Sequence, residues 1–264
     1  MQILRTGRDL ETFFRSVARH SGQPLLLLDY DGTLAPFQKD RDKAVPYPGV
    51  VDALTALQEV GRTRLVIVSG RSVQDIPRLL HLNPLPEIWG SHGWERQLSD
   101  GKYSIAGLSP EARQGLEAAY AAVQETGGAD HCERKPASLA LHWRGLNPAL
   151  VESYKPATID RWTAISLEYG LELHSFDGGV ELRVPGRDKG FAVRSLLAEM
   201  GAETPTAYLG DDATDEDAFA AVGSAGLGVL VRPEYRATRA DVWLRPPEEL
   251  LSFLHSWRVA DELR

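Results

Sequence analysis

The segment LLLLDYDGT, residues 25–33, constrains the fold more than any other stretch of this chain. Four consecutive leucines predict a short β-strand that is buried on both faces, as in a parallel sheet. Two aspartates, Asp29 and Asp31, follow at once and place two negative charges close together at the end of the strand. Neighbouring carboxylates repel each other unless a cation or hydrogen-bond donors stabilise them. The segment therefore predicts a buried strand that ends in an acidic, cation-binding site.

The same kind of unit recurs in the first and last thirds of the chain. Apolar runs of strand length end in SGR at residues 69–71 and in GDD at residues 210–212, and a helical pattern follows each of them. Alternating strands and helices predict a parallel sheet with helices on both faces. Ligands in such sheets collect at the carboxyl ends of the strands. We therefore expect these polar segments to lie near Asp29.

The middle of the chain has a different pattern. Residues 109–128 predict a helix, and two short strands follow it. Residues 148–170 predict a second helix, which we expect to be interrupted at Pro156 because proline removes a backbone donor. Two further strands, joined by a turn that contains Asp177, complete a helix-strand-strand pattern that occurs twice.

The length of 264 residues allows one large domain or two smaller ones. The changes of pattern near residues 105 and 184 favour two. We therefore expect an α/β fold with a Rossmann-like parallel-sheet core domain formed by residues 1–104 and 184–264. An inserted α+β cap domain is expected over residues 105–183.

Charge and cysteine content limit the functional classes. The formal charge of −8 and the pI of about 5.4 argue against nucleic acid or an anionic membrane surface as a partner. No apolar run reaches the ~18 residues of a membrane span, and the charged first 22 residues lack the apolar core of a signal peptide. The single cysteine, Cys132, permits no intramolecular disulfide. We expect a cytoplasmic monomer that binds a small molecule.

Four polar clusters supply chemistry that fits together. The carboxylates of Asp29, Asp31 and Asp211 offer the oxygen ligands that Mg²⁺ prefers, in combination with phosphate oxygens. Lys189 opens a predicted helix, where the helix dipole disfavours a lysine unless an anion is near. The hydroxyl of Ser69 and the amides at helix starts can donate hydrogen bonds to phosphate. Together they predict a phosphoryl-transfer site with Mg²⁺ as its cofactor.

The order of these clusters resembles the haloacid dehalogenase-like phosphohydrolases. DYDGT, SGR, a later KG and GDDATD match the motifs of that superfamily in sequence order. Four longer segments narrow the resemblance to the trehalose-6-phosphate phosphatases, over most of residues 25–255. They are HGWE at 92–95, ERKPASLALHWR at 133–144, ELRVPGRDKG at 181–190 and GDDATDEDAF at 210–219. Two departures are Trp143, where relatives often have tyrosine, and the longer spacer before Lys189.

The resemblance implies a role for each residue of the motifs. Asp29 would be the nucleophile that forms an aspartyl-phosphate, and Asp31 would act as acid and then as base. Mg²⁺ would bind the Asp29 carboxylate, the Asp31 carbonyl and Asp211, and Asp212 and Asp215 would orient these ligands. The contacts implied for the phosphate are those of Ser69, Gly32, Thr33, Gly70, Arg71 and Lys189.

The resemblance also implies how the sugar is recognised. His92 and Gly93 are expected to meet the substrate from the core domain. Without the resemblance, an ordinary solvated strand face would be the favoured interpretation of the charged residues of the cap. The cap residues expected to bind the sugar hydroxyls are Glu133, Lys135, Arg144 and Glu181.

We therefore expect a Mg²⁺-dependent phosphatase that hydrolyses trehalose 6-phosphate to trehalose and phosphate. The nearest alternative is the same chemistry on another sugar phosphate, such as that of sucrose, mannosyl-glycerate or glucosyl-glycerol. A phosphomutase would share Asp29 and Asp31, but motif resemblance favours the phosphatase. A non-catalytic phosphosugar-binding domain is a further alternative, against which the presence of both aspartates and Asp211 argues.

Overall fold

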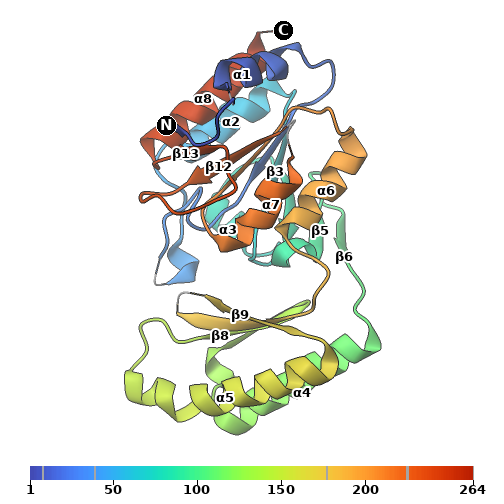
Figure 1. The fold of residues 1–264 in the computed structure, drawn as a ribbon, viewed down its shortest axis with the longest axis vertical. Coiled ribbons are helices and arrows are strands. Elements are labelled where there is room, and N and C mark those ends of the chain that lie inside the picture. Colours follow the sequence, from blue (N-terminus) through green and yellow to red (C-terminus); the bar gives the residue numbers. More distant parts are fainter. Residues whose placement is uncertain (8, 39, 177, 224–225, 264) are drawn as a thin grey trace. The chain divides into compact units, whose positions relative to one another are not determined.

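The computed structural model describes residues 1–7, 9–38, 40–176, 178–223 and 226–263, so the predicted turn residue Asp177 lies outside the described residues. The chain forms two compact units (Figure 1). The core unit combines Met1–Ser104 with Asp188–Arg264, and the inserted unit is Ile105–Arg187.

The core unit is built on a nine-stranded sheet in the order β1-β13-β12-β11-β2-β3-β4-β5-β6. The six strands from β13 to β4 run parallel, whereas β1 and β5 are antiparallel to β13 and β4. The strand bounds are β1 Gln2–Ile3, β2 Leu25–Leu28, β3 Arg64–Val68, β4 Glu87–Gly90, β5 Glu95–Gln97, β6 Tyr103–Ile105, β11 Thr206–Gly210, β12 Leu227–Val231 and β13 Val242–Leu244.

Helices cover both faces of this sheet, and the four leucines of β2 show why. Leu26 and Leu28 pack into one hydrophobic cluster with α1, α2, α3 and α8, and Leu25 and Leu27 pack into another with α6 and α7. All four are fully buried, which confirms the predicted doubly covered strand. The helix bounds are α1 Leu10–Arg19, α2 Val50–Val60, α3 Ile76–Leu80, α6 Lys189–Met200, α7 Glu216–Ala221 and α8 Glu248–Glu262.

The strand order reverses between β2 and its neighbour β11. From β2 the chain adds β3 and β4 on one side, and from β11 it adds β12 and β13 on the other. In open parallel sheets a crevice forms at such a point, outside the carboxyl ends of the strands. The loops that follow β2 and β11 meet there.

The inserted unit has its own four-stranded antiparallel sheet in the order β7-β8-β10-β9. Figure 1 shows its two helices, α4 and α5, side by side against this sheet. The apolar side chains Leu139, Leu141, Val180 and Leu182 are buried. The element bounds are α4 Pro110–Thr126, β7 Cys132–Lys135, β8 Ser138–His142, α5 Pro148–Tyr169, β9 Glu172–Phe176 and β10 Gly179–Arg183.

The prediction that Pro156 interrupts the second helix of this unit is wrong. The helix α5 continues through Pro156 in its interior. Tyr154, Thr158 and Trp162 around the proline are completely buried, and the Trp162 indole donates to the Ala119 carbonyl of α4 at 3.0 Å. Packing along α5 therefore outweighs the ~3 kcal/mol that an interior proline costs.

None of the helices within the described ranges combines the length and the apolar character that a membrane span requires.

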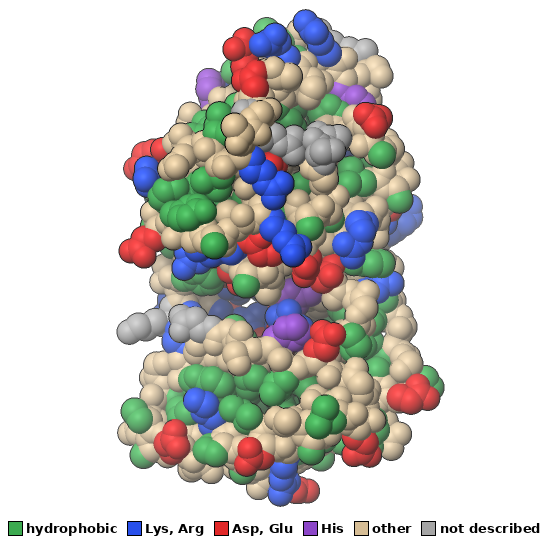
Figure 2. Space-filling view, viewed as in Figure 1, with side chains coloured by type: hydrophobic (Ala, Val, Ile, Leu, Met, Phe, Trp, Pro, Cys, Tyr) green, Lys and Arg blue, Asp and Glu red, His purple; other side chains and the backbone are tan. Residues whose placement is uncertain are grey.

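On the face of the molecule drawn in Figure 2, basic and acidic side chains are interspersed. Mixed charge of this kind is ordinary for a protein surface.

Candidate active site

The carboxyl ends of three adjacent strands bring the predicted catalytic residues together. Asp29 follows β2, Ser69 follows β3 and Asp211 follows β11, and β2 pairs with both β3 and β11. Lys189 is the first residue of α6, which begins at the N-cap Asp188. The fold thus gathers residues that are 160 positions apart in sequence (Asp29 and Lys189).

A buried ammonium lies between two buried carboxylates at the centre of this group. The Lys189 Nζ atom is 2.8 Å from Asp29 Oδ1 and 2.8 Å from Asp215 Oδ1. The relative exposure of Asp29, Lys189 and Asp215 is 4% or less. Ion pairs in such surroundings are weakly screened by solvent, so this network fixes the geometry of Asp29.

The carboxylate of Asp215 is completely occupied by donors. Its Oδ1 accepts from Lys189 Nζ and from the Tyr208 hydroxyl at 2.6 Å. Its Oδ2 accepts from the backbone N–H groups of Asp211 at 2.9 Å and Asp212 at 3.0 Å. A carboxylate has about four lone-pair sites, so Asp215 anchors the loop after β11 and has none left for a metal ion.

Burial changes the proton affinity of the central groups. It raises the pKa of Asp29 well above its usual value, against the lowering effect of Lys189, and Asp215 adds to the rise. It also raises the pKa of Asp211, to which Asp215 and Asp29 again contribute. For Lys189, burial opposes the charged form, but Asp215 and Asp29 outweigh it and hold its pKa well above the usual value. Asp29 and Asp211 therefore lack the nearby positive charge that would keep both of them ionised.

The donor set fits a hard divalent cation. One carboxylate oxygen each of Asp29, Asp211 and Asp215 lies within 4.8 Å of the others. Because Asp215 is occupied, Asp29 and Asp211 are the carboxylates that could bind the ion. Gly32 makes room for Asp211: a Cβ at this position would be 2.2 Å from Asp211 Oδ2, and its φ of +80° also favours glycine.

Asp31 is held by Arg71, a contact that the sequence did not reveal. The Arg71 Nε and Nη2 atoms donate to the two Asp31 oxygens at 2.6 and 2.7 Å. Arg71 Nη2 also donates to the Arg41 carbonyl at 2.8 Å, and the Arg71 N–H donates to Ser69 Oγ at 3.1 Å. Two of the three nitrogens of the guanidinium are thus engaged within the protein, so the predicted contact between Arg71 and phosphate is left to the buried Nη1.

The turn formed by residues 91–93 places His92 beside Gly70, at the end of β3. Ser91 and His92 have φ of +48° and +54°, a left-handed backbone conformation that residues other than glycine adopt at an energetic cost. A Cβ at Gly70 would lie 2.6 Å from the His92 ring. His92 also contributes, after Lys189 and Thr214, to holding the pKa of Asp212 below its usual value although burial opposes this.

Three further predicted residues lie in these loops. Thr33 is fully buried, and its Oγ1 has no hydrogen-bond partner among the described residues. Asp212 accepts from Thr214 N at 2.7 Å and caps a short 3₁₀ turn, Ala213–Asp215. Gly93 has φ of +92° and approaches the Asp188 carbonyl, so the loop lies against the start of α6.

The inserted unit carries three of its four predicted residues, Glu133, Lys135 and Glu181, on one face of its sheet. Strand alternation and register place one set of side chains on the face opposite the apolar one. Almost all of them are polar or charged. They are Glu133, Lys135, Ser138, Ala140, His142, Glu172, His174, Phe176, Glu181 and Arg183, with Gly179 between His142 and Phe176.

Glu181 is the centre of this polar face. It is 2% exposed, and its Oε1 accepts from Lys135 Nζ at 3.0 Å and from Ser138 Oγ at 2.7 Å. Its Oε2 accepts from Arg183 Nε at 2.8 Å. Two of the predicted sugar-binding residues, Lys135 and Glu181, are thus in contact, and Arg183, which was not predicted as a site residue, belongs to the same group.

Glu133 and Arg144 lie beside this group. Glu133 Oε2 is 3.1 Å from His142 Nε2, and the His142 ring meets the Phe176 ring edge-on at 5.4 Å. Arg144 lies against Gly178, where a Cβ would be 2.5 Å from the Arg144 Cβ. Three of the predicted sugar-binding residues, Glu133, Lys135 and Glu181, therefore share one face of the sheet, and Arg144 follows β8 next to Gly178.

Three residues that form hydrogen bonds in the core site were not predicted from the sequence. Arg236 and Arg232 donate to the carbonyl of Asp211, and Tyr208 donates to Asp215. The tyrosine is part of a strand, and the arginines belong to a loop whose path the sequence does not predict. Only the clustering of arginines in VRPEYRATRA, residues 231–240, is visible in the sequence.

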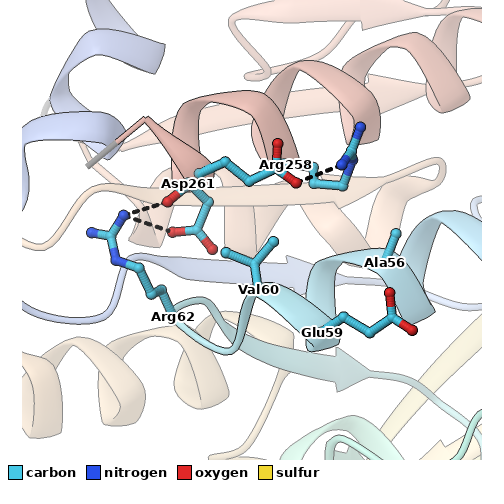
Figure 3. A pocket seen from close by; sticks show the side chains of 7 residues that line it. Ala56, Glu59, Val60, Arg62, Arg258 and Asp261 are labelled. Atoms are coloured by element: carbon cyan, nitrogen blue, oxygen red, sulfur yellow. Dashed lines mark hydrogen bonds and ion pairs between the residues drawn. The ribbon is translucent and has the colours of Figure 1, made fainter.

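A cavity of about 460 Å³ lies elsewhere in the core unit and contains none of the predicted residues. It is lined by residues from the ends of α2 and α8, including Glu59 and Asp261 (Figure 3). Arg62 precedes β3, so the cavity is at the amino end of the parallel strands, opposite Asp29. Arg62 pairs with the fully buried Asp261 at 3.6 Å, which gives this place a structural role in joining α8 to the sheet.

Comparisons with known proteins agree with this geometry. The trehalose-phosphatase family model matches residues 27–241. The trehalose-phosphate phosphatase of Mycobacterium marinum is 33% identical over 254 residues, which cover 91% of this chain and 62% of that protein. The chain thus spans less than two thirds of the length of this relative.

Solved structures show the same fold. The structure of a trehalose-6-phosphate phosphatase related protein matches with a TM-score of 0.69 at 29% identity, over 89% of this chain and 97% of that chain. The C-terminal domain of the C. albicans trehalose-6-phosphate phosphatase matches with a TM-score of 0.75 at 21% identity, over 100% of both chains.

Proposed function

Because this chain belongs to the trehalose-phosphatase family, we propose that it hydrolyses trehalose 6-phosphate to trehalose and inorganic phosphate. The observation that carries the proposal is the buried group at the ends of β2 and β11. There the Lys189 ammonium lies 2.8 Å from both Asp29 and Asp215, and Asp29 lies close to Asp211. This arrangement suits nucleophilic attack by a carboxylate on a phosphate ester.

In the first half of the reaction, an oxygen of Asp29 attacks phosphorus and the bond from phosphorus to the sugar oxygen breaks. Asp31 donates a proton to that oxygen, so trehalose leaves as a neutral alcohol. In the second half, Asp31 takes a proton from water, the water oxygen attacks phosphorus, and phosphate and free Asp29 are released. Each oxygen of Asp31 accepts one hydrogen bond from Arg71, and because a carboxylate has about four lone-pair sites, a site on each oxygen is left for the proton.

A magnesium ion would bind the Asp29 and Asp211 carboxylates together with the Asp31 carbonyl. When bound, it would neutralise negative charge that gathers on the transferring phosphoryl group. Lys189 keeps Asp29 in place and can donate to a phosphate oxygen, and Ser69, Thr33 and the amides near Gly32 and Gly70 can hold the other oxygens.

Sugar recognition belongs in this proposal to the inserted unit, acting as a cap. Glu133, Lys135 and Glu181 share a polar face that can exchange hydrogen bonds with hydroxyl groups, and Arg144 would add a further donor from the turn that follows β8. A site built to bind hydroxyls discriminates strongly against ligands that lack them. His92 and Gly93 would meet the substrate from the core unit.

The test is phosphate release from trehalose 6-phosphate, glucose 6-phosphate, sucrose 6-phosphate and an aryl phosphate, each with Mg²⁺ and with EDTA. We expect Mg²⁺-dependent turnover with a preference for trehalose 6-phosphate. Equal turnover of all four esters would leave the phosphatase chemistry standing and remove the sugar assignment. Absence of turnover on every ester would overturn the proposed activity.

A further inference from the structure

The loop after β11 is held from two sides, and only one of them was expected. The backbone N–H groups of Asp211 and Asp212 both donate to Asp215, as described above. The carbonyl groups of the same two residues accept from Arg236: its Nε donates to the Asp211 oxygen at 3.1 Å, and its Nη2 donates to the Asp212 oxygen. We propose that Arg236 is a positioning residue that aims the Asp211 carboxylate at the divalent cation.

Arg236 is itself held in place by its neighbours. Its Nη1 lies 2.7 Å from Glu216 Oε1 at the start of α7 and donates to the Ala237 carbonyl at 2.9 Å. The side chain is 23% exposed. The planar guanidinium can address two carbonyls at once because its donors form a rigid fork, whereas a lysine ammonium is a single point.

The Asp211 carboxylate has little space in which to move. Gly32 packs so closely against the Asp211 carboxylate that a Cβ would be 2.2 Å from it. A carboxylate in such a narrow space depends on the direction of its own peptide groups, and these are the groups that Arg236 binds. Residues that orient the ligands of a metal ion typically change its affinity 10- to 100-fold when they are replaced.

The sign of the effect separates positioning from electrostatics. Arg236 carries a positive charge close to the cation site, and like charges repel. If its charge were its main influence, removing it would strengthen cation binding. If Arg236 positions Asp211, removing it weakens binding. Arg236→Lys retains the charge and loses the fork, so any loss in that variant reports geometry alone.

The inference rests on the proposed metal site, and the experiment tests both separately. The dissociation constant of Mn²⁺ or Mg²⁺ is measured by titration calorimetry on the full chain without substrate, together with the melting temperature of the metal-free protein. We expect Arg236→Gln and Arg236→Lys to weaken binding about 10-fold. Arg232→Gln is the control, because Arg232 reaches only the Asp211 carbonyl, at 3.4 Å, and we expect a smaller change there.

A second readout excludes a merely structural effect. In both Arg236 variants, the Mg²⁺ concentration for half-maximal phosphatase activity should rise, and saturating Mg²⁺ should restore most of kcat. Unchanged affinity in Arg236→Lys, or tighter binding in Arg236→Gln, would overturn the inference. If Arg236→Gln did not fold, Arg236→Lys would decide alone. Wild-type protein that binds neither ion would overturn the metal proposal itself.

Discussion

Asp215 in the core unit and Glu181 in the inserted unit are both buried carboxylates surrounded by donors, but their donors differ. Two of the four donors to Asp215 are backbone N–H groups, and the other two belong to side chains from α6 and β11. The donors to Glu181 described above, by contrast, are side chains on its own sheet. Asp215 therefore fixes the path of a loop, whereas Glu181 arranges the side chains of a surface. The loop after β11 thus depends on backbone donors as well as on side chains, whereas the polar face of the inserted unit depends on side chains.

The largest effect expected in the core is that of Asp29→Asn. An amide cannot replace the carboxylate in forming the aspartyl-phosphate, so kcat should fall by about 10⁴-fold or more, on the scale of losing a nucleophile. The loss should be equal for trehalose 6-phosphate and for an aryl phosphate, measured by phosphate release. Circular dichroism would verify the fold. Retained turnover would refute the nucleophile assignment.

The buried carboxylates of Asp215 and Glu181 can be compared directly by removing one ammonium donor from each, through Lys189→Met and Lys135→Met. The first variant leaves Asp29 and Asp215 buried without their ammonium, and breaking such a pair costs roughly 3–5 kcal/mol of unfolding free energy. The second should cost less, because Arg183 and Ser138 still donate to Glu181. Urea unfolding with each variant gives both values. Equal losses would show that the two environments do not differ in the way described.

Two glycines offer a matched pair of steric tests. Gly32→Ala would push against Asp211 and should weaken Mg²⁺ binding by about 10- to 100-fold. Gly178→Ala would push against Arg144 at a similar φ of +80°. We expect it to raise KM for trehalose 6-phosphate while kcat/KM for an aryl phosphate stays unchanged. Loss of aryl phosphate hydrolysis in Gly178→Ala would contradict the separation of roles.

The polar surface itself is tested by Glu133→Ala and Lys135→Ala. Each removes a charged hydrogen-bonding group, worth about 1.5–3 kcal/mol, so kcat/KM for trehalose 6-phosphate should fall at least about 10-fold. Hydrolysis of the aryl phosphate serves as the internal control. An equal loss on both esters would mean that these residues act on the core chemistry and not on the sugar.

The smallest effect is expected for Phe176→Leu. The Phe176 ring is 36% exposed beside His142 and fills the space above Gly179, where a Cβ would be 1.9 Å from it. Leucine keeps the apolar volume and loses the ring, a difference of about 0.5–1.5 kcal/mol for aromatic contacts. We expect a several-fold rise in KM for trehalose 6-phosphate, with Phe176→Tyr close to wild type. A KM that is unchanged in Phe176→Leu would exclude the ring from sugar binding.

The sequence predicted the core sheet well because its signals are local. Leu25–Leu28 have the composition of a doubly covered strand, and the residues at the ends of β2, β3 and β11 indicated where a ligand could bind. The helix-strand-strand pattern of the inserted unit is also visible in the sequence. The helices α1 and α8 were not predicted, although Asp9 caps α1 in the ordinary way.

What the sequence did not predict depends on contacts between distant segments. Pro156 looks like a break until the packing of α4 and α5 is known, because that packing outweighs its local cost. The contact of Arg71 with Asp31 was not predicted, because the distance between them is set by the pairing of β2 with β3. Arg236 is 25 residues from Asp211 in sequence and in direct contact with it in the structure. Motif spacing in the sequence does not predict contacts between segments that are far apart in the chain.

The acidity of the core site has a consequence for the order in which ligands bind. Four carboxylates, those of Asp29, Asp211, Asp212 and Asp215, face the single ammonium of Lys189. Burial and mutual repulsion raise the pKa of both Asp29 and Asp211, and an approaching phosphate dianion would be repelled by the acids that are ionised. A bound divalent cation would favour the ionised form of Asp29, which is the form that can attack phosphorus. Substrate and cation should therefore bind in sequence, cation first, and the free Mg²⁺ concentration should set the apparent affinity for the ester.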